Sequence, residues 1–262
     1  METSVVEKSN RTVEVLPDSE ALSLRAAAIF VSASRNSIAT KKCFAAAISG
    51  GSTPRRLYML LGSDAYRDQV DWQRVHLFWA DERCVPKEDE ASNFGTAFDT
   101  LLSKVGLPGN NIHRMKGEET PDKAAGDYEQ EIRRFFGESK RPRFDLIILG
   151  VGEDGHTASL FPGTKSLEET VRLVLPVYLE TPKKNRITLT FPVLNHADQI
   201  LFLVAGSSKA AVLSEILGDG GKKKGFPAGL IRPAHGTITW LIDQEAAAKL
   251  RGLGSPRRRR GR

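Results

Sequence analysis

A histidine and an aspartate stand two residues apart in a glycine-rich loop that follows a continuous apolar run. The run, residues 144–149, is typical of a buried strand, and the loop reads Gly150-Val-Gly-Glu-Asp-Gly-His-Thr157. Histidine changes its protonation near neutral pH, so His156 is a candidate general base that activates water. The small residues after it favour an open pocket over a packed or capping histidine. Either Asp154 or Asp81, in another loop, can orient its imidazole.

The same loop formally matches the Gly-x-Gly-x-x-Gly pattern of dinucleotide-binding proteins. Its two acidic residues would repel a pyrophosphate, and Pro162 and Gly163 end the helix that should follow. No acidic residue ends a second strand of a βαβ unit of the required length. The sequence therefore argues against a dinucleotide cofactor.

A second loop, Ser49-Gly-Gly-Ser-Thr-Pro54, joins an apolar run to a predicted helix. Gly50 and Gly51 let a ligand approach the backbone, the helix start offers free N–H groups, and Ser52 and Thr53 add hydroxyls. This combination predicts a phosphate-binding turn; the alternative is an ordinary strand–helix turn capped by its Ser and Thr. The loop has neither the Gly-Lys-Ser/Thr of a P-loop nor the Gly-x-Ser-x-Gly of a nucleophile elbow.

Two cationic side chains stand in further loops that follow apolar runs. Arg83, in Asp81-Glu82-Arg83, can hold a phosphate or a developing oxyanion through its planar guanidinium. Lys209, in Gly206-Ser-Ser-Lys209, can place a point charge at a helix start. The alternatives are a solvated charge cluster for 81–83 and an ordinary surface lysine for Lys209. His235 is expected near the site, supporting it without touching the ligand.

Alternating apolar runs and amphipathic segments must position these loops. Strands are expected at residues 13–16, 43–48, 75–79, 144–149, 172–178, 187–191, 199–204 and 237–242, and helices from Asp18, from Pro54, and over 93–102, 121–136, 209–217 and 244–250. Buried strands between helices indicate an α/β fold: a single domain with a mostly parallel sheet flanked by helices on both faces. Such sheets bind ligands beyond the carboxyl ends of their strands, where the four loops are expected.

Composition excludes several classes of protein. The 262 residues carry a net charge of +6, and five arginines stand in the last eight residues, 255–262, so the body is close to neutral. We expect a flexible N-terminus at 1–10, a catalytic domain at 11–254 and a disordered Arg-rich tail at 255–262. No apolar stretch reaches the ~18 residues that a membrane span needs. Two cysteines and no histidine pair at ligand spacing predict no disulfide framework, no metal site and a reducing, cytoplasmic location.

Taken in order, these loops resemble the 6-phosphogluconolactonases of the pentose phosphate pathway. The resemblance rests on Ser-Gly-Gly-Ser-Thr-Pro (49–54), Asp-Glu-Arg-x-Val-Pro (81–86), Ser-Asn-Phe (92–94), the segment 144–163, Arg-Ile-Thr-Leu-Thr (186–190) and Gly-x-x-Lys (206–209). It spans roughly residues 13–250, and 144–163 is its most specific part. It implies a modified Rossmann-like domain on the scaffold of glucosamine-6-phosphate deaminase, and a lactonase that uses neither a metal nor a cofactor.

The resemblance also implies a reaction, the hydrolysis of 6-phospho-D-glucono-1,5-lactone to 6-phospho-D-gluconate. His156 would take a proton from the water that attacks C1 and return it to the ring oxygen. Arg83 or loop N–H groups would stabilise the oxyanion. The implied contacts of the phosphorylated sugar lactone are Gly50, Gly51, Ser52, Thr53, Arg83 and Lys209.

Two alternatives stay open. One is a sugar-phosphate isomerase or deaminase on the same scaffold; deaminases continue Ile-Ala-Phe-Asn-Glu-Pro after the histidine, whereas this chain has Phe161 in place of that Glu, which favours the lactonase. The other is a non-catalytic sugar-phosphate sensor whose basic tail contacts nucleic acid. The body offers neither a helix-turn-helix nor a basic face, so such contact is expected only weakly and through the tail. We expect a monomer or a small homo-oligomer.

Overall fold

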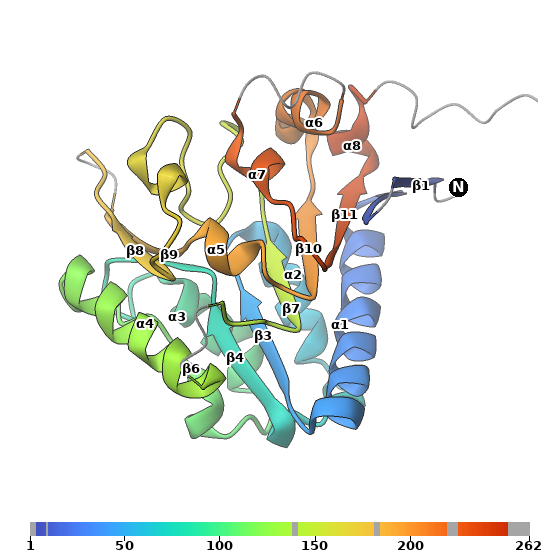
Figure 1. The fold of residues 1–262 in the computed structure, drawn as a ribbon. Helices are drawn as coiled ribbons and strands as arrows, with labels where there is room; N and C mark the ends of the chain where they lie inside the picture. Colours follow the sequence, from blue (N-terminus) through green and yellow to red (C-terminus); the bar gives the residue numbers. More distant parts are fainter. Residues whose placement is uncertain (1–3, 9, 138–140, 181–183, 219–224, 251–262) are drawn as a thin grey trace, which may run out of the picture.

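The computed structural model describes residues 4–8, 10–137, 141–180, 184–218 and 225–250. Within these ranges, eight strands form one sheet in the order β1-β2-β11-β10-β7-β3-β4-β6 (Figure 1). All neighbouring pairs run parallel except β1 and β2, which are antiparallel. The strands are β1 (Ser4–Lys8), β2 (Arg11–Leu16), β3 (Phe44–Ile48), β4 (Val75–Trp79), β6 (Ile112–His113), β7 (Leu146–Leu149), β10 (Gln199–Val204) and β11 (Thr237–Asp243).

A second, smaller sheet is antiparallel and has the order β5-β9-β8. Its strands are β5 (Asp81–Arg83), β8 (Val174–Val177) and β9 (Arg186–Leu189). Proline lacks the N–H that a central strand must donate, and Pro176 accordingly lies in β8 at the edge of this sheet.

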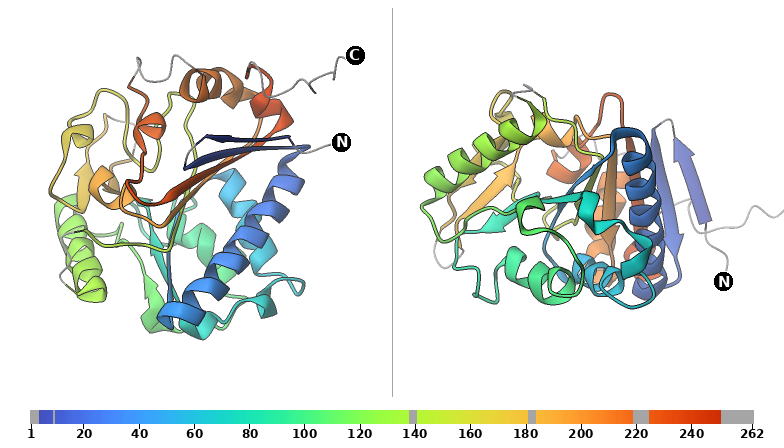
Figure 2. Two further views of the ribbon diagram at one scale, coloured as in Figure 1. Left: turned by 45° about the vertical axis from the view of Figure 1, so that its right-hand side comes forward. Right: turned by 90° about the horizontal axis from the view of Figure 1, so that it is seen from below.

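Helices lie on both faces of the large sheet (Figure 2). They are α1 (Ser19–Lys41), α2 (Ser52–Leu61), α3 (Asn93–Ala97), α4 (Pro121–Phe136), α5 (Phe191–Leu194), α6 (Ala210–Leu217), α7 (Pro227–Leu230) and α8 (Gln244–Ala247). α1 packs against α2 and against β11, β3 and β10, and α4 packs against β8 and β9. Across the described residues, no helix is long and apolar enough to cross a membrane.

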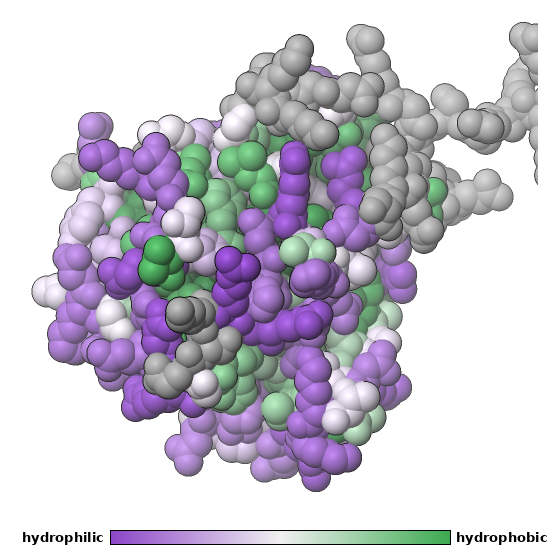
Figure 3. All heavy atoms as spheres, viewed as in Figure 1, coloured by the Kyte–Doolittle hydropathy of each residue, from purple (hydrophilic) through white to green (hydrophobic). Residues whose placement is uncertain are grey.

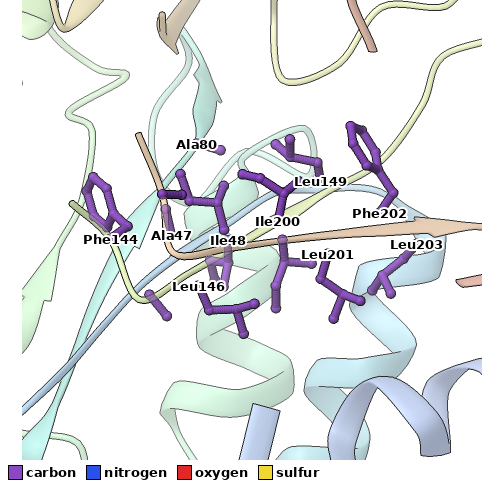
Figure 4. Packing of buried hydrophobic residues seen from close by; sticks show 14 of the residues in the cluster. Ala47, Ile48, Ala80, Phe144, Leu146, Leu149, Ile200, Leu201, Phe202 and Leu203 are labelled. Atoms are coloured by element: carbon purple, nitrogen blue, oxygen red, sulfur yellow. The ribbon is translucent and has the colours of Figure 1, made fainter. Parts of the chain in front are cut away.

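The core follows from strands that are buried on both sides. Every residue of β3 and of β7 is buried, as parallel strands between two helical layers require. Side chains along β10 alternate: Ile200 and Phe202 lie on one side of the strand and Leu201 and Leu203 on the other (Figure 4). The visible face of the molecule, in contrast, is mostly hydrophilic, with hydrophobic residues in small groups (Figure 3).

The predicted fold class is confirmed, and most predicted elements are found. Asp18 caps α1 as expected, with its carboxylate accepting the N–H groups of Glu20 and Ala21 at 2.9 and 2.8 Å. The helix at 121–136 is found with the predicted bounds. The predicted helix at 244–250 is shorter, because α8 ends at Ala247.

Four segments differ from the sequence-based expectation. The N-terminus was expected to be flexible over 1–10, but Ser4–Lys8 forms β1 and pairs with β2. The predicted strands at 172–178 and 187–191 form the small sheet and not the large one, and residues 81–83 form β5 and not a free loop. The pairing of β5 with β9 joins segments about a hundred residues apart, which local patterns do not encode. The predicted tail at 255–262 lies outside the described residues.

Candidate active site

A cavity of about 320 Å³ opens where the carboxyl ends of the central strands meet the small sheet. Four loops named from the sequence contribute to it, from segments far apart in the chain. Its lining includes Ser49, Gly50, Gly51, Ser52, Thr53, Pro54, Asp81, Arg83, Asn93, Gly150, Val151, Gly152, His156, Ala158, Ser159, Phe161, Arg186, Leu203, Val204, Ala205 and Lys209. The lining thus brings together all the predicted site residues except Asp154.

His156 is held by Asp154, which lies behind it. Nδ1 of His156 is 2.6 Å from Oδ1 of Asp154, and the same oxygen accepts the backbone N–H of His156 at 3.1 Å. With its proton on Nδ1, the imidazole has Nε2 free to accept a proton. Partial burial acts to raise the pKa of Asp154, but these hydrogen bonds from His156 outweigh it and lower that pKa. The carboxylate is therefore ionised over the neutral pH range.

Asp81, the other candidate partner of His156, lines the cavity but makes its hydrogen bonds to other residues. Its buried carboxylate accepts hydrogen bonds from Ser159 Oγ at 2.7 Å and from Asn93 Nδ2 at 3.2 Å. No hydrogen bond links it to His156 among the described residues. Of the two candidate partners left open by the sequence, the geometry favours Asp154 as the residue that orients the imidazole. Asp81 instead joins the loop that follows His156 to the start of α3.

Glu82 was not predicted as a site residue, yet it sets the geometry around Arg83. Its carboxylate accepts the backbone N–H groups of Arg83, Asn93 and Phe94, each at 2.7 Å. Burial raises the pKa of Glu82 to about 6, although the N–H groups act in the opposite direction. A carboxylate from β5 thus caps the start of α3 and fixes the two elements that carry Arg83 and Asn93.

Arg83 and Arg186 face one another across the small sheet. They are direct partners in the pairing of β5 with β9, and both line the cavity. Nη1 of Arg83 donates to the carbonyl of Ala91, while Nε of each arginine is buried without a hydrogen-bond partner among the described residues. Burial and, next, the charge of Arg83 lower the pKa of Arg186. Two positive charges on directly paired residues repel each other, and a bound anion would relieve this repulsion. The pair is therefore suited to bind an anion.

Arg186 was missed as a site residue by the sequence reasoning, although a signal for it existed. The segment Arg-Ile-Thr-Leu-Thr (186–190) was recognised as a motif, but its arginine stood at the start of a predicted strand and received no role. Asn93 was missed in the same way inside Ser-Asn-Phe (92–94). Arg186 reaches the site by strand pairing with β5, and Asn93 does so by hydrogen bonds to Asp81 of β5. No local sequence pattern predicts either contact.

Arg83 and Arg186 form one cationic region of the cavity, and the start of α2, with the partial positive charge of a helix N-terminus, forms a second one. Gly51, at φ +111°, precedes the helix without any side-chain cap on the helix N-terminus, so the first N–H groups of α2 stay available to a ligand. A Cβ on Gly50 would lie 1.8 Å from Oδ1 of Asn93, which explains the glycine there. Tyr58 reaches back from α2 and donates its hydroxyl to the carbonyl of Ser49 at 2.5 Å. The turn is therefore held in place from the helix side.

Lys209 lines the same cavity as the start of α2. It follows a tight turn after β10, lines the cavity and retains 24% of its side-chain exposure. Its ammonium lies 4.0 Å from Oε1 of Glu153, in the loop that carries His156. An uncapped helix start and a lysine that enter one cavity suit a phosphate group.

His235 is not where the sequence placed it. It is exposed and precedes β11, so it stands at the amino end of a strand whose carboxyl end faces the site. The cavity lining does not include it. Among the described residues, no group of three or more His, Cys, Asp or Glu side chains is arranged to bind a metal ion.

Comparisons with known proteins identify the family. The model of the family of glucosamine-6-phosphate isomerases and 6-phosphogluconolactonases matches residues 17–240. The chain is 35% identical over 243 residues to a 6-phosphogluconolactonase of Nostoc, covering 92% of this chain and 98% of that protein. It is 40% identical over 210 residues to a 6-phosphogluconolactonase of Rattus norvegicus, covering 79% and 80%.

Solved structures give the same result. A 6-phosphogluconolactonase from Thermotoga maritima has a TM-score of 0.77 at 30% identity, covering 89% of this chain and 100% of that one. A monomeric glucosamine-6-phosphate deaminase shares the fold with a TM-score of 0.75, at 22% identity, over 90% of this chain and 99% of that one. The chain therefore belongs to the family of glucosamine-6-phosphate isomerases and 6-phosphogluconolactonases.

Proposed function

We propose that this protein hydrolyses 6-phospho-D-glucono-1,5-lactone to 6-phospho-D-gluconate. The observation that carries the proposal is the oriented His156 in a cavity with two separate cationic regions, one for a phosphate and one for a developing oxyanion. The names of the relatives, which are 6-phosphogluconolactonases, support the same substrate. We further propose that residues 11–254, together with β1, which pairs with β2 in the same sheet, form the catalytic domain of a cytoplasmic monomer or small homo-oligomer.

The proposed chemistry needs no covalent intermediate, because a δ-lactone is already an activated ester. Neutral His156 takes a proton from water through Nε2 while Asp154 holds Nδ1–H. The water oxygen bonds to C1 and the carbonyl electrons move to its oxygen. When the tetrahedral intermediate collapses, the bond from C1 to the ring oxygen breaks and His156 returns the proton to that oxygen. General base catalysis of this kind contributes about 10²–10⁴ in rate.

The two cationic regions have separate tasks in this proposal. Arg83 and Arg186 stabilise the oxyanion that forms on C1, where each donor is worth on the order of 10²–10³ in rate. The start of α2, with Ser52 and Thr53, binds the phosphate together with Lys209. A phosphate held away from C1 orients the lactone for attack without entering the reaction.

Freshly made 6-phosphogluconolactone tests the function directly. We expect hydrolysis well above the spontaneous rate, which a control without enzyme must define for each time point. The same preparation is expected to release no ammonia from glucosamine 6-phosphate, because Phe161 replaces the glutamate of the deaminases. Ammonia release without lactone hydrolysis would overturn the proposal in favour of the deaminase.

Replacing Lys209 by alanine is expected to raise KM about 10-fold or more, since a charge-assisted hydrogen bond is worth roughly 1.5–3 kcal/mol. kcat should stay within about threefold of wild type, because the phosphate takes no part in the chemistry. Steady-state kinetics on the lactone measure both constants. Lys165→Ala, an exposed lysine outside the cavity lining, is the matched control. An unchanged KM in Lys209→Ala would remove this residue from the phosphate site.

A further inference from the structure

Asp243 is a buried carboxylate that ends β11 and contacts two neighbouring segments. Asp243 is only 4% exposed, and its two carboxylate oxygens accept the backbone N–H of Gly206 at 3.1 and 3.0 Å. Oδ1 also accepts the N–H of Ala246 at 2.8 Å, so that Asp243 caps the N-terminus of α8. A buried charge persists only where hydrogen bonds compensate its desolvation, and here backbone N–H groups provide them.

Gly206 begins the turn that carries Lys209 into the cavity. Its φ of +94° is in the left-handed region, so the chain reverses direction here by means of glycine. The carbonyl of Gly206 accepts the N–H of Lys209 at 3.1 Å, which closes the turn. Among the described residues, no side chain within the turn caps it, and the same holds for the start of α6. The carboxylate of Asp243 therefore supplies the side-chain hydrogen bonds that fix the orientation of the 206–209 turn.

We propose that Asp243 is a positioning residue for phosphate binding: it holds the 206–209 turn so that the ammonium of Lys209 points into the active-site cavity. This inference rests on the proposed function, because it concerns the same phosphate. Asp243 itself is not in the lining of that cavity but in the lining of an adjoining one of about 350 Å³, which shares Ser52, Thr53 and Ala205 with it. Its effect on the substrate is thus carried by Lys209.

The alternative for Asp243 is a purely structural cap, and the chain offers a matched control for it. Asp18 lines the same adjoining cavity and accepts two backbone N–H groups at the start of α1, but in the described part of the chain it makes no hydrogen bond to the 206–209 turn. Asp243→Ala and Asp18→Ala are both expected to lower the melting temperature. Only Asp243→Ala is expected to raise KM for the lactone, by about 3- to 10-fold, with kcat nearly unchanged. Equal KM values in the two variants would overturn the inference.

Asp243→Asn separates the geometry from the charge. The Oδ1 of asparagine can still accept the N–H groups of Gly206 and Ala246, so KM should stay within about threefold of wild type. A 10-fold rise in this variant would overturn the inference, since the turn would then not be what matters. This variant also keeps the test decisive where Asp243→Ala fails to fold.

A double-mutant cycle tests whether Asp243 acts through Lys209. In the Lys209→Ala background, adding Asp243→Ala is expected to raise KM no further, because the side chain that it positions is already gone. An additive rise would contradict the inference. If the wild-type protein hydrolyses no lactone, the proposed function is wrong, but the inference about Asp243 can still be tested. The affinity for inorganic phosphate, measured by calorimetric titration, is then compared between the variants in place of KM. Weaker phosphate binding in Asp243→Ala than in Asp18→Ala then supports the inference, and equal binding overturns it.

Discussion

Replacing His156 by alanine is expected to lower kcat by about 10²–10⁴-fold and to leave KM within about threefold. The reason is that in the proposed mechanism the imidazole touches the attacking water and the ring oxygen, whereas binding depends on groups elsewhere in the cavity. Hydrolysis of the lactone under saturating substrate measures the effect, with the spontaneous rate subtracted. His235→Ala is the control, because this exposed histidine lies at the opposite edge of the sheet and should retain full activity.

The pH dependence of kcat/KM tests the same assignment. His156 must be neutral to accept a proton, so activity is expected to fall as the pH is lowered. Asp154 should not add a second ionisation to the pH profile near neutral pH, because its hydrogen bonds to His156 keep its pKa below the usual value. Asp154→Asn, which no longer fixes the proton on Nδ1, is expected to lower kcat without abolishing it. Near wild-type turnover in His156→Ala would refute the general-base assignment.

The sequence predicted the components of the site better than their arrangement. Glycine-rich turns after apolar runs are local signals, and the parallel sheet places them at one edge, so His156, Lys209 and the 49–54 turn could all be located from patterns. The backbone in these loops follows directly from residue type, as Gly51 and Gly206 with their positive φ angles show. Local chemistry and topology were sufficient for these residues.

The contacts between loops could not be read from the sequence. Ser159 and Asp81 are 78 residues apart, and their hydrogen bond joins Asp81 to the loop after His156. The short run 81–83 has no strand pattern of its own and becomes a strand only by pairing with β9. That pairing also brings Arg186 opposite Arg83. Sequence reasoning therefore found residues whose role is local and missed those whose role depends on a partner.

Gly152 gives the second large prediction, because it lies against His156 and Asp154, the proposed catalytic pair. A Cβ on Gly152 would lie 2.0 Å from Nδ1 and 2.2 Å from Cε1 of His156, and 2.6 Å from Oδ1 of Asp154. These distances are far below van der Waals contact, so the imidazole or the carboxylate must move. Gly152→Ala is expected to lower kcat by about 10²-fold, the cost of displacing a catalytic group by about 1 Å.

The control for Gly152→Ala lies two residues earlier in the same loop. A Cβ on Gly150 meets no atom within 4 Å, so Gly150→Ala should keep kcat within about fivefold of wild type. Both substitutions remove the same backbone freedom from the unfolded chain, so the difference between them reports the collision with His156. A crystal structure of Gly152→Ala should show the Asp154–His156 contact lengthened or lost. Equal kcat values in the two variants would mean that the reaction does not depend on the position of His156, and the proposed mechanism would fail with it.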